Sequence, residues 1–201
     1  LQVHGPGMLH SATKQIKSVA DLKGMKVRGP TRQITKLLGA VGATPVGMPL
    51  PGIPDALSKG TIEACAIPWE VVPSVKVHEL TKFHSEFDNT AGALYTTTFV
   101  MAMNKAKYES LPADLKKVID ANSGAATSAA LGKQQQANDV AGRKAAVDRG
   151  NTIYQFTAAQ REEFVKLSAQ IDDEWVADMD KRGFQGAQLL STARSLVVKY
   201  K

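Results

Sequence analysis

The chain has 201 residues, of which 43% are hydrophobic and 22% charged, an ordinary globular composition that suits one large domain or two small lobes. Its net charge of +6 is spread along the chain, and its aromatic residues, 6% of the total, do not alternate with basic ones, so we expect a solvated basic surface and no nucleic-acid partner. One cysteine excludes an intramolecular disulfide, and no run approaches the ~18 apolar residues that a membrane-spanning helix needs.

The first half of the chain alternates short strands with short helices. Residues 1–3 read as a strand that has already begun, so we expect a mature or truncated piece, and the glycines and proline of residues 4–8 indicate a loop. The spacing from Ser18 to Asp21 predicts one capped helical turn, and Thr31 is suited to cap a longer helix. The short connections predict a parallel sheet with crossover helices. The expected strands are 25–28, 44–48 and 61–66, and the expected helices are 31–41 and 53–58.

The middle of the chain gives weaker signals. Residues 68–72 predict a short helix, and residues 75–83 are expected to be irregular or helical. The strongest strand signal of the chain is at 94–103, which is rich in Tyr, Thr, Phe and Val. Asn104 is then suited to cap a short helix that ends at Ser110.

A long helix is predicted between Pro112 and Gly150. Proline suits the first turn of a helix, and only glycines interrupt the helical pattern that follows. Such a helix would have about 38 residues and a length of roughly 57 Å, which is too long for one small lobe and indicates a connecting spine. A strand at 152–156, a helix capped by Thr157 and a last helix from Gly186 complete the chain.

No catalytic or metal-binding constellation is evident. Cys65 lies between Ala64 and Ala66 in a predicted strand, which favours a buried inert thiol over a nucleophile. The four histidines lack metal-ligand spacing, although His4 and His10 flank a glycine-rich loop from which they could touch a ligand. We therefore expect no enzyme, no metal and no cofactor.

Arg28 is the candidate binding residue. It ends a predicted strand, and Gly29 and Pro30 break the chain before the helix that Thr31 caps. Ligands of α/β sheets bind beyond the carboxyl ends of strands, and a guanidinium offers a donor fork that matches a carboxylate. The alternatives are a surface cation or a partner of a helix carboxylate. Trp69 follows the third predicted strand and would lie on the same side of the sheet, either in the core or as a site wall.

Four segments together resemble the substrate-binding proteins of TRAP transporters, the DctP family. They are DLKGMKVR at 21–28, GATPVGM at 42–48, DALSKGTIE at 55–63 and LPADL at 111–115, and they follow the family's order over essentially the whole chain. The four segments together are specific evidence for this family, whereas DLKG alone would be weak evidence. The long helix from Pro112 is also similar to the family's interlobe spine.

The resemblance implies a periplasmic receptor that binds a small organic acid and delivers it to a membrane permease. The implied fold is α/β, a periplasmic-binding-protein-like (type II) two-lobe fold with a long interlobe helix. Arg28 takes the position of the family's main ligand anchor, and Thr31 at the helix N-terminus could add donors. The loops after the second and third strands supply site walls, and His10 is a further candidate. These wall residues are Met48, Leu50, Ile67, Pro68 and Trp69.

The sequence departs from the family pattern in two places near the site. Ile67 stands where many members have asparagine, and the loop at 4–10 carries no arginine where many members have a second one. One cation beside a more apolar wall suits a monocarboxylate with an apolar, aromatic or hydroxylated body better than a dicarboxylate.

The third departure is length, because the family's chains are longer and the first lobe would be largely missing. By analogy, residues 5–98 and 139–201 form the second lobe with the arginine anchor, and residues 99–138 are a crossing strand and half-helix of the first. Apolar faces of 99–138 would then lack partners, so we expect an exposed patch, disorder or pairing with another chain, such as a homodimer. The alternative function is a truncated lobe that acts as a non-binding interaction or dimerisation module.

Overall fold

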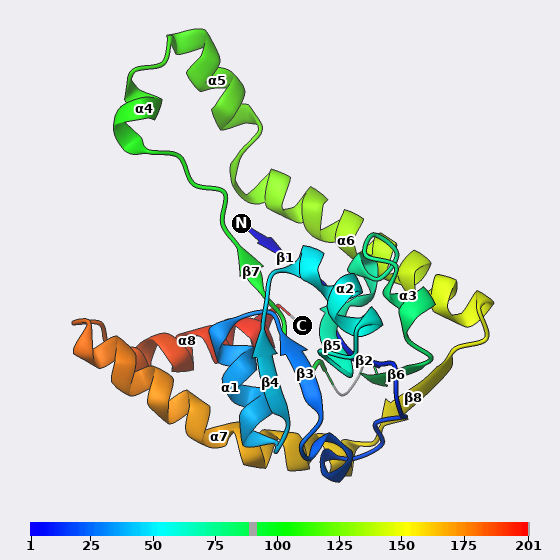
Figure 1. The fold of residues 1–201 in the computed structure, drawn as a ribbon. Helices are drawn as coiled ribbons and strands as arrows, with labels where there is room; N and C mark the ends of the chain where they lie inside the picture. Colours follow the sequence, from blue (N-terminus) through cyan, green and yellow to red (C-terminus); the bar gives the residue numbers. More distant parts are fainter. Residues whose placement is uncertain (89–91, 201) are drawn as a thin grey trace.

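The fold is built around a six-stranded mixed sheet (Figure 1). The computed structural model describes residues 1–88 and 92–200. The strand order is β4-β3-β5-β2-β6-β8, and a small second sheet pairs β1 with β7. The strands are β1 (Gln2–Val3), β2 (Gly7–Ser11), β3 (Lys26–Gly29), β4 (Thr44–Gly47), β5 (Ala64–Pro68), β6 (Phe83–Phe87), β7 (Thr98–Phe99) and β8 (Thr152–Phe156).

The carboxyl ends of five strands meet at one edge of the large sheet. β3 is parallel to β4 and β5, and β6 is parallel to β8, whereas β2 runs antiparallel to both β5 and β6. The ends of β3, β4, β5, β6 and β8 therefore lie at the edge where β2 begins. This is the edge at which α/β sheets bind their ligands.

The prediction of a purely parallel sheet is wrong at the centre of the sheet. The sequence predicts a loop at residues 4–8 and irregular or helical structure at 75–83, but β2 begins at Gly7 and β6 at Phe83. All of β2 and most of β6 are buried. Neither strand therefore shows the alternation of apolar and polar residues that marks a half-exposed strand.

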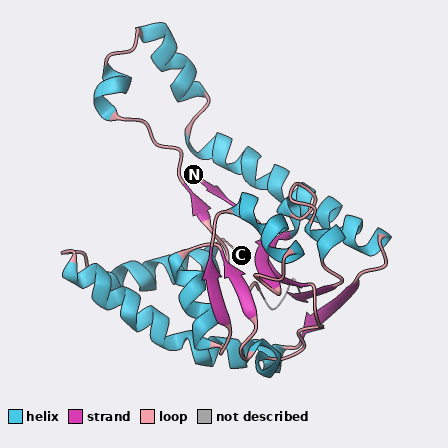
Figure 2. Ribbon diagram, in the orientation of Figure 1, coloured by secondary structure: helices cyan, strands magenta, loops and turns pink. Residues whose placement is uncertain are grey.

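Helices cover both faces of the sheet (Figure 2). Helices α1 (Arg32–Ala40) and α7 (Ala158–Lys181) lie on one face, and α8 (Gly186–Lys199) packs against α7. The other face carries α2 (Ile53–Ser58), α3 (Val77–Leu80) and α6 (Gly124–Asp148), with the short 3₁₀ helix η3 (Trp69–Val71) against α6. Two further 3₁₀ helices are η1 (Val19–Leu22) and η2 (Leu50–Gly52). No helix within residues 1–88 and 92–200 is both long and apolar enough to cross a membrane.

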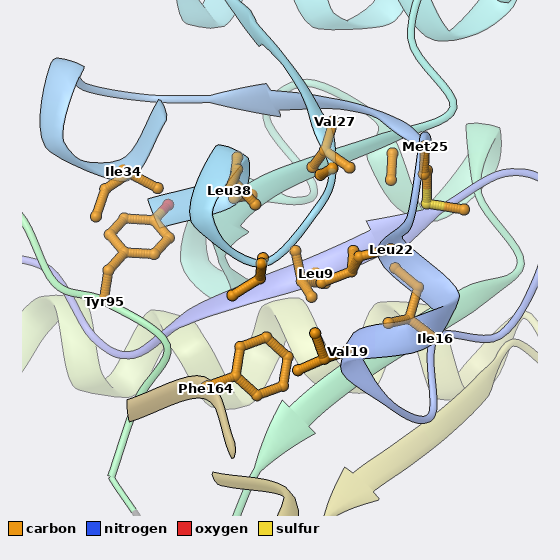
Figure 3. Packing of buried hydrophobic residues seen from close by; sticks show 14 of the residues in the cluster. Leu9, Ile16, Val19, Leu22, Met25, Val27, Ile34, Leu38, Tyr95 and Phe164 are labelled. Atoms are coloured by element: carbon orange, nitrogen blue, oxygen red, sulfur yellow. The ribbon is translucent and has the colours of Figure 1, made fainter. Parts of the chain in front are cut away.

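Each face of the sheet has its own hydrophobic cluster. The pleat of β5 divides its residues, so that Ala64 and Ala66 join one cluster and Cys65 and Ile67 join the other. The first cluster packs α1 and α7 against the sheet, and Figure 3 shows Phe164 of α7 close to Leu9 in its centre. Other members labelled in that view are Ile16, Val19, Leu22, Met25, Val27, Ile34, Leu38 and Tyr95.

Local capping signals predict the helices next to the strand ends well. Thr31 caps α1 by accepting the N–H of Ile34 over 3.3 Å, and Gly42 follows the helix with φ = +87°. A left-handed residue ends a right-handed helix, and glycine adopts that conformation without a steric penalty. Thr157 and Gln160 form the predicted capping box at the start of α7.

The single long helix predicted after Pro112 is two helices. Helix α5 (Ala113–Ala121) ends, and α6 begins at Gly124 after a break at Asn122 and Ser123. Gly124 has φ = +81°, which a continuous right-handed helix cannot contain. The chain therefore turns between the two helices. Figure 1 shows α5 and the preceding α4 (Lys105–Glu109) standing away from the rest of the molecule.

The strand predicted at 94–103 is also much shorter than expected. Its high β-propensity is satisfied only at Thr98–Phe99, because the partner strand β1 is Gln2–Val3. A strand requires a partner for its backbone groups, and among the described residues no other strand pairs with this segment. Tyr95, earlier in the segment, forms an isolated bridge with Gly7.

Candidate carboxylate-binding site

Arg28 lies near the end of β3, between β4 and β5, and is only 5% exposed. Its Nε donates a hydrogen bond to the Met48 carbonyl, and its Nη1 donates one to the Ala66 carbonyl, each over 3.1 Å. One carbonyl follows β4 and the other lies in β5, so the guanidinium bridges three neighbouring strands. Its orientation is thus set by the backbone, and its other N–H groups are bonded to no described residue.

The charge of Arg28 is not balanced within the described part of the chain. None of the ion pairs there involves this guanidinium. Burial lowers the pKa of Arg28 from its usual value, while the nearby Tyr95 and Cys65 side chains oppose that shift. Arginine stays protonated in proteins despite such effects. A buried cation without a counter-ion is costly, so an entering carboxylate would be stabilised here.

A cavity of about 700 Å³ opens beside Arg28. It lies between the end of β3, the N-terminus of α1 and the loop after β4, and four of the predicted site residues line it. These four are Arg28, Thr31, Met48 and Leu50. The other lining residues are Gly29, Pro30, Arg32, Thr35, Lys36, Gly47 and Pro49.

The turn from β3 into α1 is tight because Gly29 has no side chain. A Cβ atom at this position would lie 2.7 Å from Thr35 Oγ1, closer than real Cβ contacts. The Thr35 hydroxyl in turn donates to the Thr31 carbonyl over 2.8 Å. This packing places the N-terminus of α1, with its partial positive charge, at the wall of the cavity.

Four other predicted site residues do not line this cavity. Pro68 is buried and ends β5 opposite Gly7, while Ile67, Trp69 and His10 are each at most 3% exposed. His10 Nε2 donates to the Ile67 carbonyl over 3.1 Å. These side chains lie in the interior next to the strand end that carries the Ala66 carbonyl. They pack in the interior beside that strand end, and among them His10 is hydrogen-bonded to the Ile67 carbonyl.

His10 also forms a buried pair with His84 across β2 and β6. The Ile67 carbonyl can only accept, so His10 carries its proton on Nε2 and its Nδ1 accepts from His84 Nδ1, 2.7 Å away. His84 Nε2 then accepts from Asn151 Nδ2 over 3.1 Å. Burial lowers the pKa of His10 well below its usual value and that of His84 to about 4. Both rings are therefore neutral at pH 7.

Trp69 connects the end of β5 to α6. Its Nε1 donates to Glu86 Oε2 over 2.8 Å, and the same carboxylate accepts from Arg143 Nη2 over 2.8 Å and from Gln155 Nε2 over 3.3 Å. Gly142 lies directly on the Trp69 carbonyl, where a Cβ atom would be only 1.9 Å from the oxygen. Trp69 lines a second cavity of about 770 Å³ beside α6, apart from the one at Arg28.

The other residues considered for catalysis or metal binding, Cys65 and His4, are packed in the protein interior. Cys65 is fully buried, as the sequence predicts, and burial raises the pKa of its thiol to about 12, which disfavours the reactive thiolate. His4 is 7% exposed, and its ring meets the edge of Tyr95 at a centroid distance of 5.5 Å. Within residues 1–88 and 92–200, no three His, Cys, Asp or Glu side chains gather in a way that could hold a metal ion.

Three residues near the site were not expected from the sequence. Arg32 and Lys36 line the cavity from α1, and the four-residue spacing of Arg32 and Lys36 on a predicted helix is a signal that could have found them. Tyr95 is buried close enough to Arg28 for the two side chains to influence each other's pKa. No local signal identifies Tyr95, because its neighbourhood depends on the distant backbone of Gly7.

Residues 1–178 match the family described as bacterial extracellular solute-binding protein, family 7 (DctP). The chain belongs to this family. The resemblance seen in the four sequence segments is therefore confirmed.

Solved structures of TRAP solute-binding proteins are closely similar. One from Rhodoferax ferrireducens, in complex with copurified benzoate, is 64% identical, with a TM-score of 0.94 over 98% of this chain and 61% of that chain. One from a marine metagenome, specific for aromatic acid ligands and bound to 3-hydroxybenzoate, is 47% identical, with a TM-score of 0.93 over 99% of this chain and 62% of that chain. These relatives have the two-lobe α/β fold, which confirms the predicted fold class.

Among curated proteins, the 2,3-diketo-L-gulonate-binding periplasmic protein YiaO of Escherichia coli is 29% identical over 185 residues. That alignment covers 92% of this chain and 48% of the relative, so the chain spans about half the length of this curated protein. All of these relatives are solute-binding proteins and not enzymes.

Proposed function

We propose that this chain is the arginine-bearing part of a periplasmic receptor of a TRAP transporter, which binds an organic acid and delivers it to the membrane permease. One observation carries the proposal. The guanidinium of Arg28 is oriented by two backbone carbonyls, has no carboxylate partner among the described residues and lines a cavity at the strand-end edge. A fork in this state binds a carboxylate through two parallel, charge-assisted hydrogen bonds.

The ligand class that fits best is an aromatic monocarboxylate. Beside the cations of β3 and α1, the cavity is lined by the apolar residues Met48, Pro49 and Leu50 and by Thr31. The two solved relatives described above hold benzoate and 3-hydroxybenzoate. An aromatic acid could place its ring against the apolar loop after β4 and its carboxylate against the Arg28 guanidinium.

The lobe assignment follows the distribution of the core. We assign residues 5–98 and 139–201 to the lobe that carries Arg28, and residues 99–138 to the other lobe; residues 89–91 and 201 lie outside the described residues. Both hydrophobic clusters are formed by residues of the first set. Helices α4 and α5, in the second set, stand away from the sheet in Figure 1. Closure of two such lobes over a ligand is the change that a permease could detect.

The proposal is tested by mass spectrometry of ligand released from the purified protein, followed by calorimetry with benzoate. Arg28→Ala removes the fork and is expected to weaken benzoate binding by at least about a hundredfold, because a charge-assisted pair with a buried guanidinium is lost. Arg28→Lys keeps the charge without the fork, so its affinity for benzoate should lie between those of Arg28→Ala and the unsubstituted protein. Arg194→Ala on α8 is the control, since Arg194 pairs with Asp172 and does not line the cavity. Unchanged affinity in Arg28→Ala would refute the anchor role.

A second candidate is the interaction or dimerisation module. Exposed apolar side chains in β7 and in the segment after it favour this candidate, because Phe99 is 50% and Met101 is 99% exposed. Light scattering at several protein concentrations measures the oligomeric state. A stable dimer whose melting temperature responds to no acid in a broad panel would support this candidate over the receptor.

A further inference from the structure

Three cationic side chains line the cavity, but two of them already have partners. Arg32 Nη2 lies 3.5 Å from Asp178 Oδ2, and Lys36 forms an ion pair with Glu174. Among the described residues, Arg28 is thus the only cation of the cavity without a carboxylate. Lys36 is neutralised by Glu174, whereas Asp178 is shared, because its Oδ2 also lies 3.0 Å from Arg182 Nη2, so Arg32 is only partly neutralised.

The pairing results from the packing of α1 against α7, which lie side by side (Figure 1). Arg32 and Lys36 are four residues apart on α1, and Glu174 and Asp178 are four residues apart on α7. Residues with this spacing share one face of a helix. Two cations on α1 therefore meet two carboxylates on α7, one of which, Asp178, also pairs with Arg182 over 3.0 Å.

We infer that Glu174 and Asp178 are positioning residues for specificity, which hold Arg32 and Lys36 and so restrict the cavity to ligands with one carboxylate. The inference rests on the proposed function. A second carboxylate on the ligand would have to displace Glu174 or Asp178, or stay without a cationic partner. A monocarboxylate needs only Arg28 and meets neither difficulty.

The two carboxylates can be changed without a large effect on folding. Both ion pairs are exposed, with Asp178 at 40% and Glu174 at 53% side-chain exposure. Exposed pairs contribute little to stability and are screened by salt. Changes in ligand affinity after these charges are removed should therefore reflect ligand preference and not loss of folding.

The experiment is calorimetry at low ionic strength with benzoate and with benzene-1,3-dicarboxylate, on the full chain. The readout is the ratio of the two dissociation constants. Replacing Glu174→Gln together with Asp178→Asn frees Arg32 and Lys36, and Arg182 with them, and should shift the ratio toward the dicarboxylate by about threefold to tenfold. The shift should disappear at about 1 M salt, where the Debye length is only about 3 Å.

Two controls separate positioning from a general charge effect. Asp172→Asn removes a carboxylate of α7 that pairs with Arg194, away from the cavity, and should leave the ratio unchanged. Glu174→Asp with Asp178→Glu keeps both charges and should restore the preference of the unsubstituted protein. An unchanged ratio in the charge-removing double variant, or an equal shift in Asp172→Asn, would overturn the inference. Failure of the unsubstituted protein to bind benzoate would overturn the proposed function and the inference with it.

Discussion

Trp69 Nε1 donates a hydrogen bond to Glu86 Oε2 over 2.8 Å, and the two residues are only 3% and 5% exposed. Trp69 follows β5, whose Ala66 carbonyl accepts from Arg28, and Glu86 also accepts from Arg143 of α6. The bond is thus part of a continuous set of contacts between Arg28 and α6. A change at Trp69 should affect the stability of this set more strongly than the shape of the cavity.

Trp69→Phe tests the energetic weight of this bond. Phenylalanine keeps most of the ring but cannot donate, so the buried Glu86 carboxylate loses one of its donors. We expect the free energy of unfolding to fall by about 1–3 kcal/mol. Trp175→Phe, on α7, is the control, because it makes the same chemical change at a half-buried position away from Glu86. Urea unfolding measures both, and equal losses would show that the hydrogen bond has no special weight.

The contact between α6 and the Trp69 carbonyl gives a second prediction. Gly142→Ala would place a Cβ atom 1.9 Å from that carbonyl oxygen, so helix and loop must move apart. We expect the free energy of unfolding to fall by about 1–3 kcal/mol. Gly132→Ala in the same helix meets nothing within 4 Å and should instead stabilise by up to about 1 kcal/mol, since alanine has the higher helix propensity. A stabilising Gly142→Ala would contradict the close contact.

Elements with their own end signals were predicted from the sequence, and elements defined by distant partners were not. Helix α2 has the predicted bounds, and α1 begins at the predicted cap Thr31. The same local pattern placed Arg28 at a strand end beside a helix N-terminus. Strands β2 and β6 gave no such signal, because their polar residues His10 and His84 are satisfied by each other across 74 positions of sequence.

The residues of the candidate site also divide into those placed by local sequence and those placed by distant contacts. Arg28, Thr31, Met48 and Leu50 are positioned by short segments of chain and lie together as expected. The side chain of Trp69 is held by Glu86, 17 positions further along the chain, and the next residue, Glu70, donates its N–H to Asp139 of α6, which is 69 positions away. The burial of Trp69 therefore could not be read from the residues around it, although its place after β5 was correct.

The turn between β3 and α1 gives a prediction about ligand binding. A Cβ atom in Gly29→Ala would lie 2.7 Å from Thr35 Oγ1 and 3.1 Å from the Thr35 backbone, so α1 must shift by a few tenths of an ångström. That shift moves Thr31 relative to Arg28, and we expect benzoate binding to weaken about tenfold, because a charge-assisted bond depends on geometry. Gly39→Ala in the same helix meets its nearest atom at 3.8 Å and is the control. Calorimetry that finds equal affinities for the two variants would rule out this role of Gly29.

The buried histidine pair makes stability depend on pH. The pKa of His84 is lowered from 6.5 to about 4 by burial, so between these values the unfolded chain binds a proton that the folded chain does not. Acidification therefore favours the unfolded state, and stability present above pH 6.5 is lost as the pH falls toward 4. The loss from His84 is expected to reach about 3 kcal/mol, and His10, whose pKa is also lowered by burial, acts in the same direction.

Other groups oppose this trend, so the histidine contribution is measured by difference. Burial raises the pKa values of Glu70 and Asp139, and such carboxyl groups recover stability as the pH falls. His84→Gln removes the titrating ring but leaves these carboxyl groups unchanged. The difference in unfolding free energy between the unsubstituted protein and His84→Gln should therefore shrink between pH 6.5 and 4 and become constant below that range. A difference that is the same at every pH from 7 to 4 would mean that His84 gains no proton on unfolding, against the hydrogen-bond arrangement in which its Nε2 only accepts.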